Sequence, residues 1–130
     1  MPSIFTRIIN GELPSVKVHE DEHTLVIMDI NPIQKGQLLV LPKSEVGTVW
    51  ELSKEDYRAL MDTVQVAGQR LARLFNDKKV GVMIEGLEVT DHAHVKVFPF
   101  ASAREYHNHP DAKNMPTSEE LEQLASKLRF

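Results

Sequence analysis

The chain has 130 residues, of which 42% are hydrophobic and 26% charged, with a formal net charge of −4 and no cysteine. This length is enough for one well-buried core and too short for two ordinary domains, so we expect a single domain over residues 1–130. The mixed charges argue against binding along a nucleic-acid backbone, and the lack of cysteine excludes disulfides and thiolate metal ligands. Because no signal-peptide pattern and no run of about eighteen apolar residues is present, we expect a cytoplasmic protein without a membrane partner.

The spacing of apolar residues predicts an α+β meander, with helices flanking antiparallel strands. The expected helices cover residues 3–9, 53–75 and 117–128. The expected strands cover residues 16–19, 24–28, 37–41, 80–84 and 92–98. Pro99 is expected to end the last strand, and the polar stretch 100–116 is expected to form an ordered loop or flap.

Capping residues mark where these helices begin. Ser3 and Ser53 each stand directly before a helical pattern, where a hydroxyl can accept a hydrogen bond from a free backbone N–H. Thr117 is followed three residues later by Glu120, which is the pattern of a capping box. The pair Asn10-Gly11 follows the first helix as a stop signal.

His92, His94 and Lys96 are the most informative group in the chain. Side chains alternate along an extended segment, so these three share one face. Imidazole offers a nucleophilic or proton-accepting nitrogen near neutral pH, and an ammonium group attracts phosphate oxygens. The row therefore predicts a site for an anionic substrate.

Two other interpretations of this strand stay open. A single histidine on a strand is more often a structural residue than a catalyst. The His-x-His spacing is also typical of two metal ligands, although Lys96 on the same face would repel a cation. A metal site would need further ligands from a set of histidines and carboxylates: His19, His23, His107, His109, Glu88 and Asp91. We rank phosphate chemistry above metal binding.

Four stretches resemble the histidine triad (HIT) superfamily of nucleotide hydrolases and transferases, over roughly the first hundred residues. They are residues 3–14, 29–32, 36–43 and 92–99. The resemblance implies an α+β fold with an antiparallel sheet of about five strands, a short N-terminal helix, one long helix and a C-terminal helix. It implies one HIT-like domain with a core over about residues 3–100 and a C-terminal loop and helix over 101–130. It also implies a homodimer whose sheets join across a two-fold axis.

By this resemblance, His94 attacks the α-phosphorus of a purine nucleotide ester, phosphoramidate or dinucleotide and forms a nucleotidyl-histidine that water then cleaves. His92 orients His94 and holds its tautomer through a local hydrogen-bond chain. Asp29 accepts hydrogen bonds from the ribose hydroxyls. The other residues expected at the nucleotide are three apolar wall residues and two polar residues near the phosphate: Phe5, Ile8, Ile27, Glu88 and Thr90. For each apolar residue taken singly, ordinary core packing is the stronger interpretation.

The triad and its surroundings also depart from the family pattern. Lys96 stands where a third histidine is expected, and lysine is a poor proton donor at neutral pH, which puts leaving-group protonation in doubt. Gln37 stands where relatives often carry histidine. Ser3 and Thr6 stand where some relatives carry cysteine, so we expect no zinc. No cofactor is expected, except that a divalent cation stays open for a polyphosphate substrate.

The segment upstream of His92 carries two carboxylates, Glu88 and Asp91, beside the expected phosphate. Amides near Gly86 and the Thr90 hydroxyl could bind phosphate oxygens, whereas these carboxylates would repel them. Asp91 could instead hold an imidazole in place. A carboxylate next to either histidine would raise its pKa and favour imidazolium, which binds phosphate but does not attack it.

The sequence is compatible with three functions. The first is an enzyme that cleaves a small-molecule nucleotide with His94 as nucleophile. The second is a nucleotide-binding module with little or no turnover, because Lys96 and Gln37 stand in place of proton-handling groups. The third is a metal-binding protein that uses the His-x-His strand.

Overall fold

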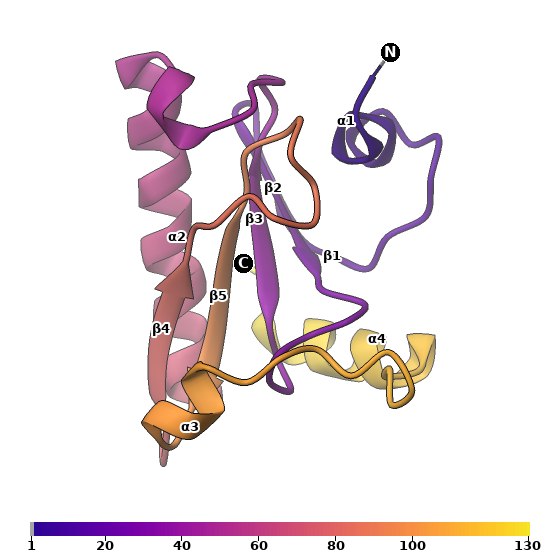
Figure 1. Cartoon of the computed structure of the whole chain (residues 1–130), viewed down its shortest axis with the longest axis vertical. Helices are drawn as coiled ribbons and strands as arrows, with labels where there is room; N and C mark the ends of the chain where they lie inside the picture. Colours follow the sequence, from indigo (N-terminus) through magenta and orange to yellow (C-terminus); the bar gives the residue numbers. More distant parts are fainter. Residues whose placement is uncertain (1) are drawn as a thin grey trace.

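The chain folds around a five-stranded antiparallel sheet with strand order β1-β2-β3-β5-β4 (Figure 1). The computed structural model describes residues 2–130. The strands are β1 (Lys17–Glu20), β2 (Thr24–Met28), β3 (Leu38–Pro42), β4 (Lys79–Met83) and β5 (Val95–Phe100). The helices are α1 (Ile4–Ile9), α2 (Lys54–Leu74), α3 (Ala103–Tyr106) and α4 (Ser118–Leu128), with a short 3₁₀ turn, η1 (Val49–Glu51). The predicted α+β class and five-stranded antiparallel sheet are confirmed.

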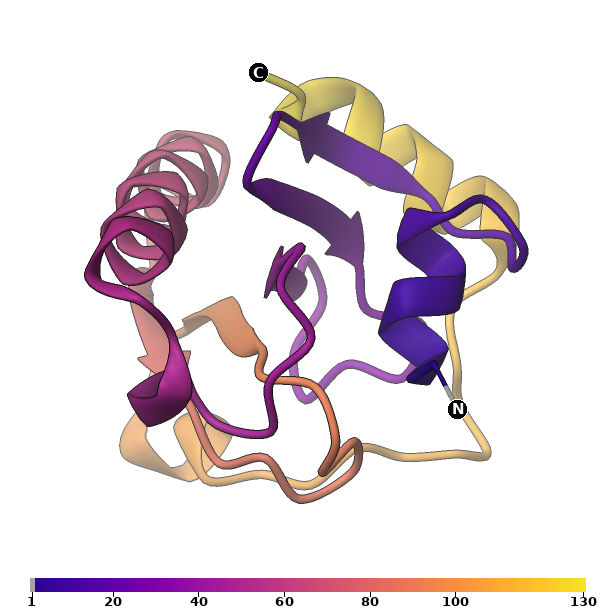
Figure 2. The ribbon, with the colours of Figure 1, turned by 90° about the horizontal axis from the view of Figure 1, so that it is seen from above.

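The helices cover the two faces of the sheet unequally. Helices α2 and α4 pack on one face, whereas α1 lies against the other (Figure 2). Every residue of β2 and β3 is buried, because these inner strands have covered faces on both sides. This is why their sequences are continuous apolar runs rather than alternating patterns. The α1 face holds the smaller apolar cluster, which leaves room there for a site.

Four sequence predictions about the second half are wrong in detail. The last strand begins at Val95 and not at residue 92, so His92 and His94 lie before it. Pro99 does not end the last strand, because β5 continues to Phe100 along β4. Strand β3 pairs with β5 only as far as Val97, so the missing N–H of Pro99 lies beyond that ladder. The predicted loop contains α3, whose Tyr106 stacks on Phe98 with ring centroids 5.2 Å apart. The chain order of a simple meander is also broken, because β5 lies between β3 and β4.

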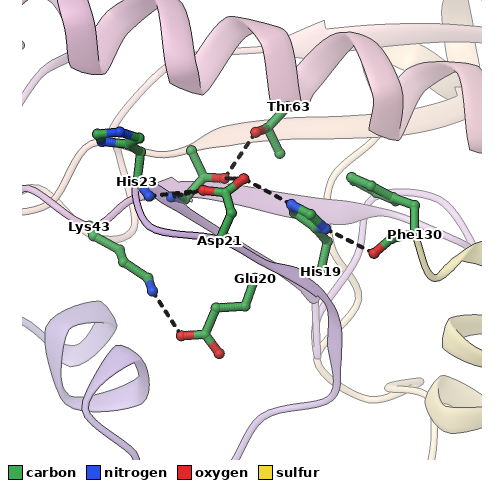
Figure 3. Close-up of polar contacts among 8 residues, drawn as sticks. His19, Glu20, Asp21, His23, Lys43, Thr63 and Phe130 are labelled. Atoms are coloured by element: carbon green, nitrogen blue, oxygen red, sulfur yellow. Dashed lines mark hydrogen bonds and ion pairs between the residues drawn. The ribbon is translucent and has the colours of Figure 1, made fainter.

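The last residue, Phe130, is attached to the β1–β2 hairpin (Figure 3). Its carbonyl oxygen accepts a hydrogen bond from Nδ1 of His19 over 2.9 Å, and the two rings stack with centroids 4.2 Å apart. Nε2 of His19 lies 2.9 Å from Oδ2 of Asp21. The hydroxyl of Thr24 links Asp21 to Thr63 of α2, at 3.0 Å and 2.9 Å. The hairpin therefore connects the C-terminal segment to the long helix.

Helix α2 is the longest in the fold, with 21 residues, and it carries charged residues along its outer face. No helix within residues 2–130 is both long and apolar enough to cross a membrane.

Candidate functional site

A pocket of about 340 Å³ opens on the α1 face of the sheet. Its walls come from α1, β2 and the loop that follows it, the segment before β5, and β5 itself. Five of its polar or charged lining residues are Asp29, Asn31, Glu88, His94 and Lys96. Strand and loop segments that are far apart in sequence thus bring most of the predicted site residues to one cavity.

The three predicted apolar wall residues, Phe5, Ile8 and Ile27, all line this pocket. Phe5 and Ile27 are also buried members of the apolar cluster beneath α1. The Phe5 ring meets the His94 ring edge-on, with centroids 5.2 Å apart. Core packing and pocket formation are therefore two roles of the same side chains.

His94 stands directly before β5 and is 3% exposed. Its Nδ1 lies 3.0 Å from the main-chain carbonyl oxygen of His92. Because a carbonyl oxygen only accepts hydrogen bonds, Nδ1 carries the ring proton and Nε2 keeps its lone pair. No group within residues 2–130 makes a hydrogen bond to that Nε2. The arrangement leaves one nucleophilic nitrogen on a ring that lines the pocket.

The side chain of His92 is fully buried and does not line the pocket. Its Nε2 donates to the carbonyl oxygen of Pro42 over 2.8 Å, and its Nδ1 accepts from the Ser3 hydroxyl over 2.7 Å. Burial lowers the pKa of His92, against the opposing effects of the Pro42 carbonyl and nearby carboxylates. The neutral ring, with one donor and one acceptor nitrogen, matches these two partners. The predicted hold on the His94 tautomer comes from the His92 carbonyl and not from its imidazole.

Ser3 and Thr6 connect His92 to the start of α1. The Ser3 hydroxyl accepts from the Thr6 N–H over 2.9 Å while it donates to His92. Oε1 of Glu45 accepts from the Ser3 N–H over 2.6 Å and from the Thr6 hydroxyl over 2.7 Å. Ala93 is held beside this network by its N–H, which donates to the Val46 carbonyl over 2.7 Å. These bonds fix the segment before β5 between α1 and the loop after β3.

The geometry does not favour the metal-binding interpretation of the His-x-His pair. Both ring nitrogens of His92 already have protein partners, so the two imidazoles do not form a shared ligand pair. His19 and His23 lie on the β1–β2 hairpin, and His107 and His109 follow α3. Among residues 2–130, no three histidine, aspartate or glutamate side chains are grouped so as to hold a metal ion.

Lys96 is held by two carboxylates, those of Glu85 and Glu88, the second at 2.9 Å. The lysine side chain is only 5% exposed. Burial lowers the pKa of Lys96, but the two carboxylates outweigh this effect and raise it above its ordinary value. Burial likewise raises the pKa of Glu88, and the Lys96 ammonium more than reverses this. The lysine is therefore an ammonium and Glu88 a carboxylate at neutral pH.

Asp29 is oriented by the loop that follows β2. Its Oδ1 accepts from the Asn31 N–H over 2.9 Å, and its Oδ2 accepts from the Gln37 side-chain amide over 2.7 Å. The buried Gln37 also accepts from the Ile33 N–H over 2.9 Å. Each oxygen of Asp29 retains a lone pair for a ligand hydroxyl. The glutamine thus positions the carboxylate that the family resemblance predicts at the ribose.

Besides His92, Thr90 is the predicted site residue that the structure does not bring to this pocket. It is exposed, and its carbonyl oxygen lies against Gly47, 3.3 Å from where a Cβ would stand. Gly86 lines a separate cleft of about 60 Å³, together with Ala93 and His94. His94 therefore borders both cavities.

Two site residues are missing from the sequence prediction. Glu85 bonds the buried lysine, yet the pair Glu85-Gly86 is also an ordinary turn pattern, which hides this role. Asn31 lines the pocket, and its buried Oδ1 has no hydrogen-bond partner within residues 2–130. An unsatisfied buried acceptor at a cavity wall fits a donor on a ligand. In the sequence, the position of Asn31 two residues after Asp29, within the segment 29–32, is the feature that indicates this role.

Comparisons with known proteins identify the family and the fold of this chain. The family model of the HIT domain matches residues 10–102. A HIT-like protein of Methanocaldococcus jannaschii is 32% identical over 126 residues, which covers 93% of this chain and 97% of that protein. The crystal structure of a Hit-like protein from Bartonella henselae has a TM-score of 0.85 and 26% identity, and covers 98% of this chain and 93% of that one.

Two relatives carry the names of enzymes. An adenosine 5'-monophosphoramidase of Schizosaccharomyces pombe is 28% identical over 103 residues, covering 76% of this chain and 74% of that protein. An adenylylsulfatase of Arabidopsis thaliana is 26% identical over 100 residues, covering 74% of this chain and 51% of that protein. Some other curated relatives match over shorter segments, which span 36% or 48% of their own length.

Proposed function

The chain belongs to the HIT domain family, and from this premise we propose that it is a nucleotide hydrolase or transferase with His94 as its nucleophile. The observation that carries the proposal is the hydrogen bond from Nδ1 of His94 to the carbonyl of His92, which leaves Nε2 free at a pocket. Nucleotide-cleaving relatives named for adenylyl sulfate and for adenosine phosphoramidate support the substrate class.

In this mechanism the pocket holds a nucleoside monophosphate unit. Asp29 accepts hydrogen bonds from the ribose hydroxyls, and Phe5 and Ile27 flank the base. Nε2 of His94 attacks the α-phosphorus, the bond to the leaving group breaks, and water later cleaves the nucleotidyl-histidine. The ring becomes cationic in the intermediate, so its Nδ1–H bond to the His92 carbonyl strengthens at that moment.

The test uses the 4-nitrophenyl ester of AMP, whose cleavage releases a coloured phenolate. His94→Ala should reduce kcat/KM by at least about 10³-fold, since the attacking atom is removed. His107→Ala, at an exposed histidine, is the matched control and should keep the wild-type rate. Rapid quenching followed by mass spectrometry should find AMP attached to His94.

A different result would favour the binding module. That function predicts AMP binding by calorimetry with no His94-dependent release of phenolate and no covalent adduct. The ion-paired Lys96 is the observation in its favour, since this lysine does not donate a proton.

We further propose that two copies pair along β4, which lies at an edge of the sheet. Exposed apolar side chains lie on and beside this edge: Trp50, Tyr57, Val82 and Ile84. Trp50 is 81% exposed and lines a shared cleft with Ile84. An unpaired strand edge beside apolar side chains is a typical site for association of two sheets.

A further inference from the structure

We propose that this site selects nucleotides by their leaving group: it cleaves those whose leaving group departs as an oxyanion, such as sulfate, phosphate, carboxylate or phenolate, and cleaves phosphoramidates poorly. The residue that sets this preference is Lys96, which offers a fixed positive charge in place of a transferable proton. The inference rests on the proposed function of His94 and narrows its substrate class.

No titratable side chain that lines the pocket is a good general acid at neutral pH. The titratable groups that line it are Asp29, Glu88, His94 and Lys96. His94 uses Nε2 as the nucleophile, and its one ring proton is held on Nδ1 by the His92 carbonyl. Glu88 is a carboxylate because it pairs with the lysine ammonium. Asp29 accepts two hydrogen bonds, as an ionised carboxylate does.

Lys96 keeps its own proton for a structural reason. Its ammonium bonds both Glu85 and Glu88, and it is almost fully buried among them. Loss of the proton would leave two carboxylates without a cation, so the charged form is strongly favoured. The group can attract negative charge, but it is a poor general acid at neutral pH.

Lys96 is close enough to act on the departing group. It lies in β5, two residues after His94, which directly precedes that strand. Both side chains line the same pocket. Glu88 is 54% exposed on the loop before His92, so an anionic leaving group can replace it beside the ammonium while Glu85 stays. The Lys96 ammonium, already in position, then stabilises the negative charge that develops on the leaving oxygen.

The bonds that form and break in each step explain why amidates should be cleaved more slowly than esters. The Nε2 lone pair of His94 forms the N–P bond, and the electron pair of the broken P–O bond leaves with the oxygen as an anion. Water then attacks phosphorus, the N–P electron pair returns to Nε2, and the proton of water passes to solvent. An amidate would have to expel a nitrogen anion, which is far too basic to leave without a proton.

The experiment measures kcat/KM for AMP release from three aryl esters of AMP, with 4-nitrophenyl, 4-chlorophenyl and phenyl leaving groups, and from adenosine 5'-phosphoramidate. The wild-type rate should fall steeply as the leaving phenol becomes more basic, and the amidate should be slower than the nitrophenyl ester by at least about 10²-fold, the usual contribution of a general acid. Lys96→His should raise kcat/KM for the amidate itself by about 10-fold or more, because imidazole donates protons near neutral pH.

Two further variants distinguish the effect of proton donation from the effect of positive charge at position 96. Lys96→Met removes the ammonium without adding a donor, so it should slow the esters and leave kcat/KM for the amidate no higher than in the wild type. Lys127→His makes the same replacement at an exposed lysine of α4 and should change nothing.

The possible results have distinct meanings. A wild-type rate that does not depend on the leaving phenol, or an amidate cleaved as fast as the nitrophenyl ester, overturns the inference while the role of His94 stands. An amidate rate raised by Lys96→Met as much as by Lys96→His also overturns it. If no compound is cleaved in a His94-dependent manner, the proposed function fails and the inference fails with it.

Discussion

His92 and His94 are the same residue type two positions apart, yet the hydrogen-bond partners of their ring nitrogens differ. His92 is enclosed by Ser3 and Pro42, and each of its nitrogens has a partner. His94 has a partner on one nitrogen only and lines a cavity. The difference arises from neighbours that are 89 and 50 residues away from His92 in the chain. At the residue scale, the nitrogen that a histidine can offer to a ligand is therefore the one without a hydrogen-bond partner in the protein.

Glu88→Gln should tighten AMP binding by about two- to five-fold at low salt. It removes a carboxylate beside the pocket, and for a half-exposed group such an interaction is worth up to about 1 kcal/mol. Calorimetry in low and high salt checks this, because screening should shrink the gain. Glu119→Gln, an exposed position on α4, is the control. Unchanged or weaker binding by Glu88→Gln would contradict the picture of this carboxylate as a competitor of phosphate.

Gln37→Leu should lower the free energy of unfolding by about 1–3 kcal/mol and weaken AMP binding. The change removes one hydrogen-bond partner from Oδ2 of the half-buried Asp29 and leaves the buried Ile33 N–H without a partner. Urea unfolding and AMP titration measure the two effects. Gln65→Leu, at an exposed position of α2, should alter neither. Normal AMP affinity in a folded Gln37→Leu protein would show that Asp29 does not need this hydrogen bond.

Elements in this fold begin at side chains that satisfy free backbone N–H groups. Ser3, Ser53 and Thr117 each accept such a bond at the start of α1, α2 and α4, and Thr117 forms a full capping box with Glu120. Asp21 does the same in the β1–β2 turn, where it accepts from the N–H groups of His23 and Thr24. These bonds are local, which is why capping patterns in the sequence located the helices well.

Asp21→Asn should lower the free energy of unfolding at pH 7 by about 1 kcal/mol, a figure discounted for solvent screening because 42% of the side chain is exposed. Burial raises the pKa of Asp21, but hydrogen bonds from His19, His23 and Thr24 outweigh it and lower the pKa from 3.8 to about 2. A lowered pKa in the folded state contributes stability above the unfolded value, and this contribution is lost as the pH falls from about 4 to about 2.

Denaturation curves at pH 7 and pH 3 test the role of Asp21. The wild type should lose more stability than Asp21→Asn as the pH falls, because the amide does not titrate. Asp62→Asn, on an exposed position of α2, should behave like the wild type. Parallel losses in wild type and Asp21→Asn would show that this carboxylate is not linked to folding.

The whole molecule divides its functions between the faces and the edge of one sheet. Helices α2 and α4 cover one face, α1 covers the other only in part and leaves the pocket, and β4 lies at an edge. Such a division lets a small protein keep one continuous core while it holds a site on the opposite face.

If β4 joins two copies, the wild type should elute as a dimer, and Val82→Lys should shift it to the monomer at micromolar concentration. A lysine on a sheet edge blocks strand pairing and adds charge to an apolar contact. Size-exclusion chromatography with light scattering measures the mass. Met115→Lys, at another exposed apolar residue, should remain dimeric. A monomeric wild type would refute the proposed interface.

The sequence by itself determined the features that depend on neighbours along the chain. The three main helices, the β1–β2 hairpin and the helix caps follow from periodicity and from hydrogen bonds within a few residues. The spacing of His92, His94 and Lys96 predicts a site for an anionic substrate from alternation along an extended segment, which is a local property. The structure brings His94 and Lys96 to one pocket and buries His92 away from it.

Only the tertiary structure decided the position of β5 between β3 and β4, the separate surroundings of the two histidines, and the capture of Lys96 by Glu85 and Glu88. Each of these features depends on packing between segments that are distant in the chain. Hydrophobic periodicity describes one segment at a time and does not indicate which segments pack together. Burial changes the cost of leaving a charge or a hydrogen-bonding atom unpaired, and which partners are within reach is set by the assembled sheet. That cost, rather than residue type, separates the structural histidine from the one that faces the pocket.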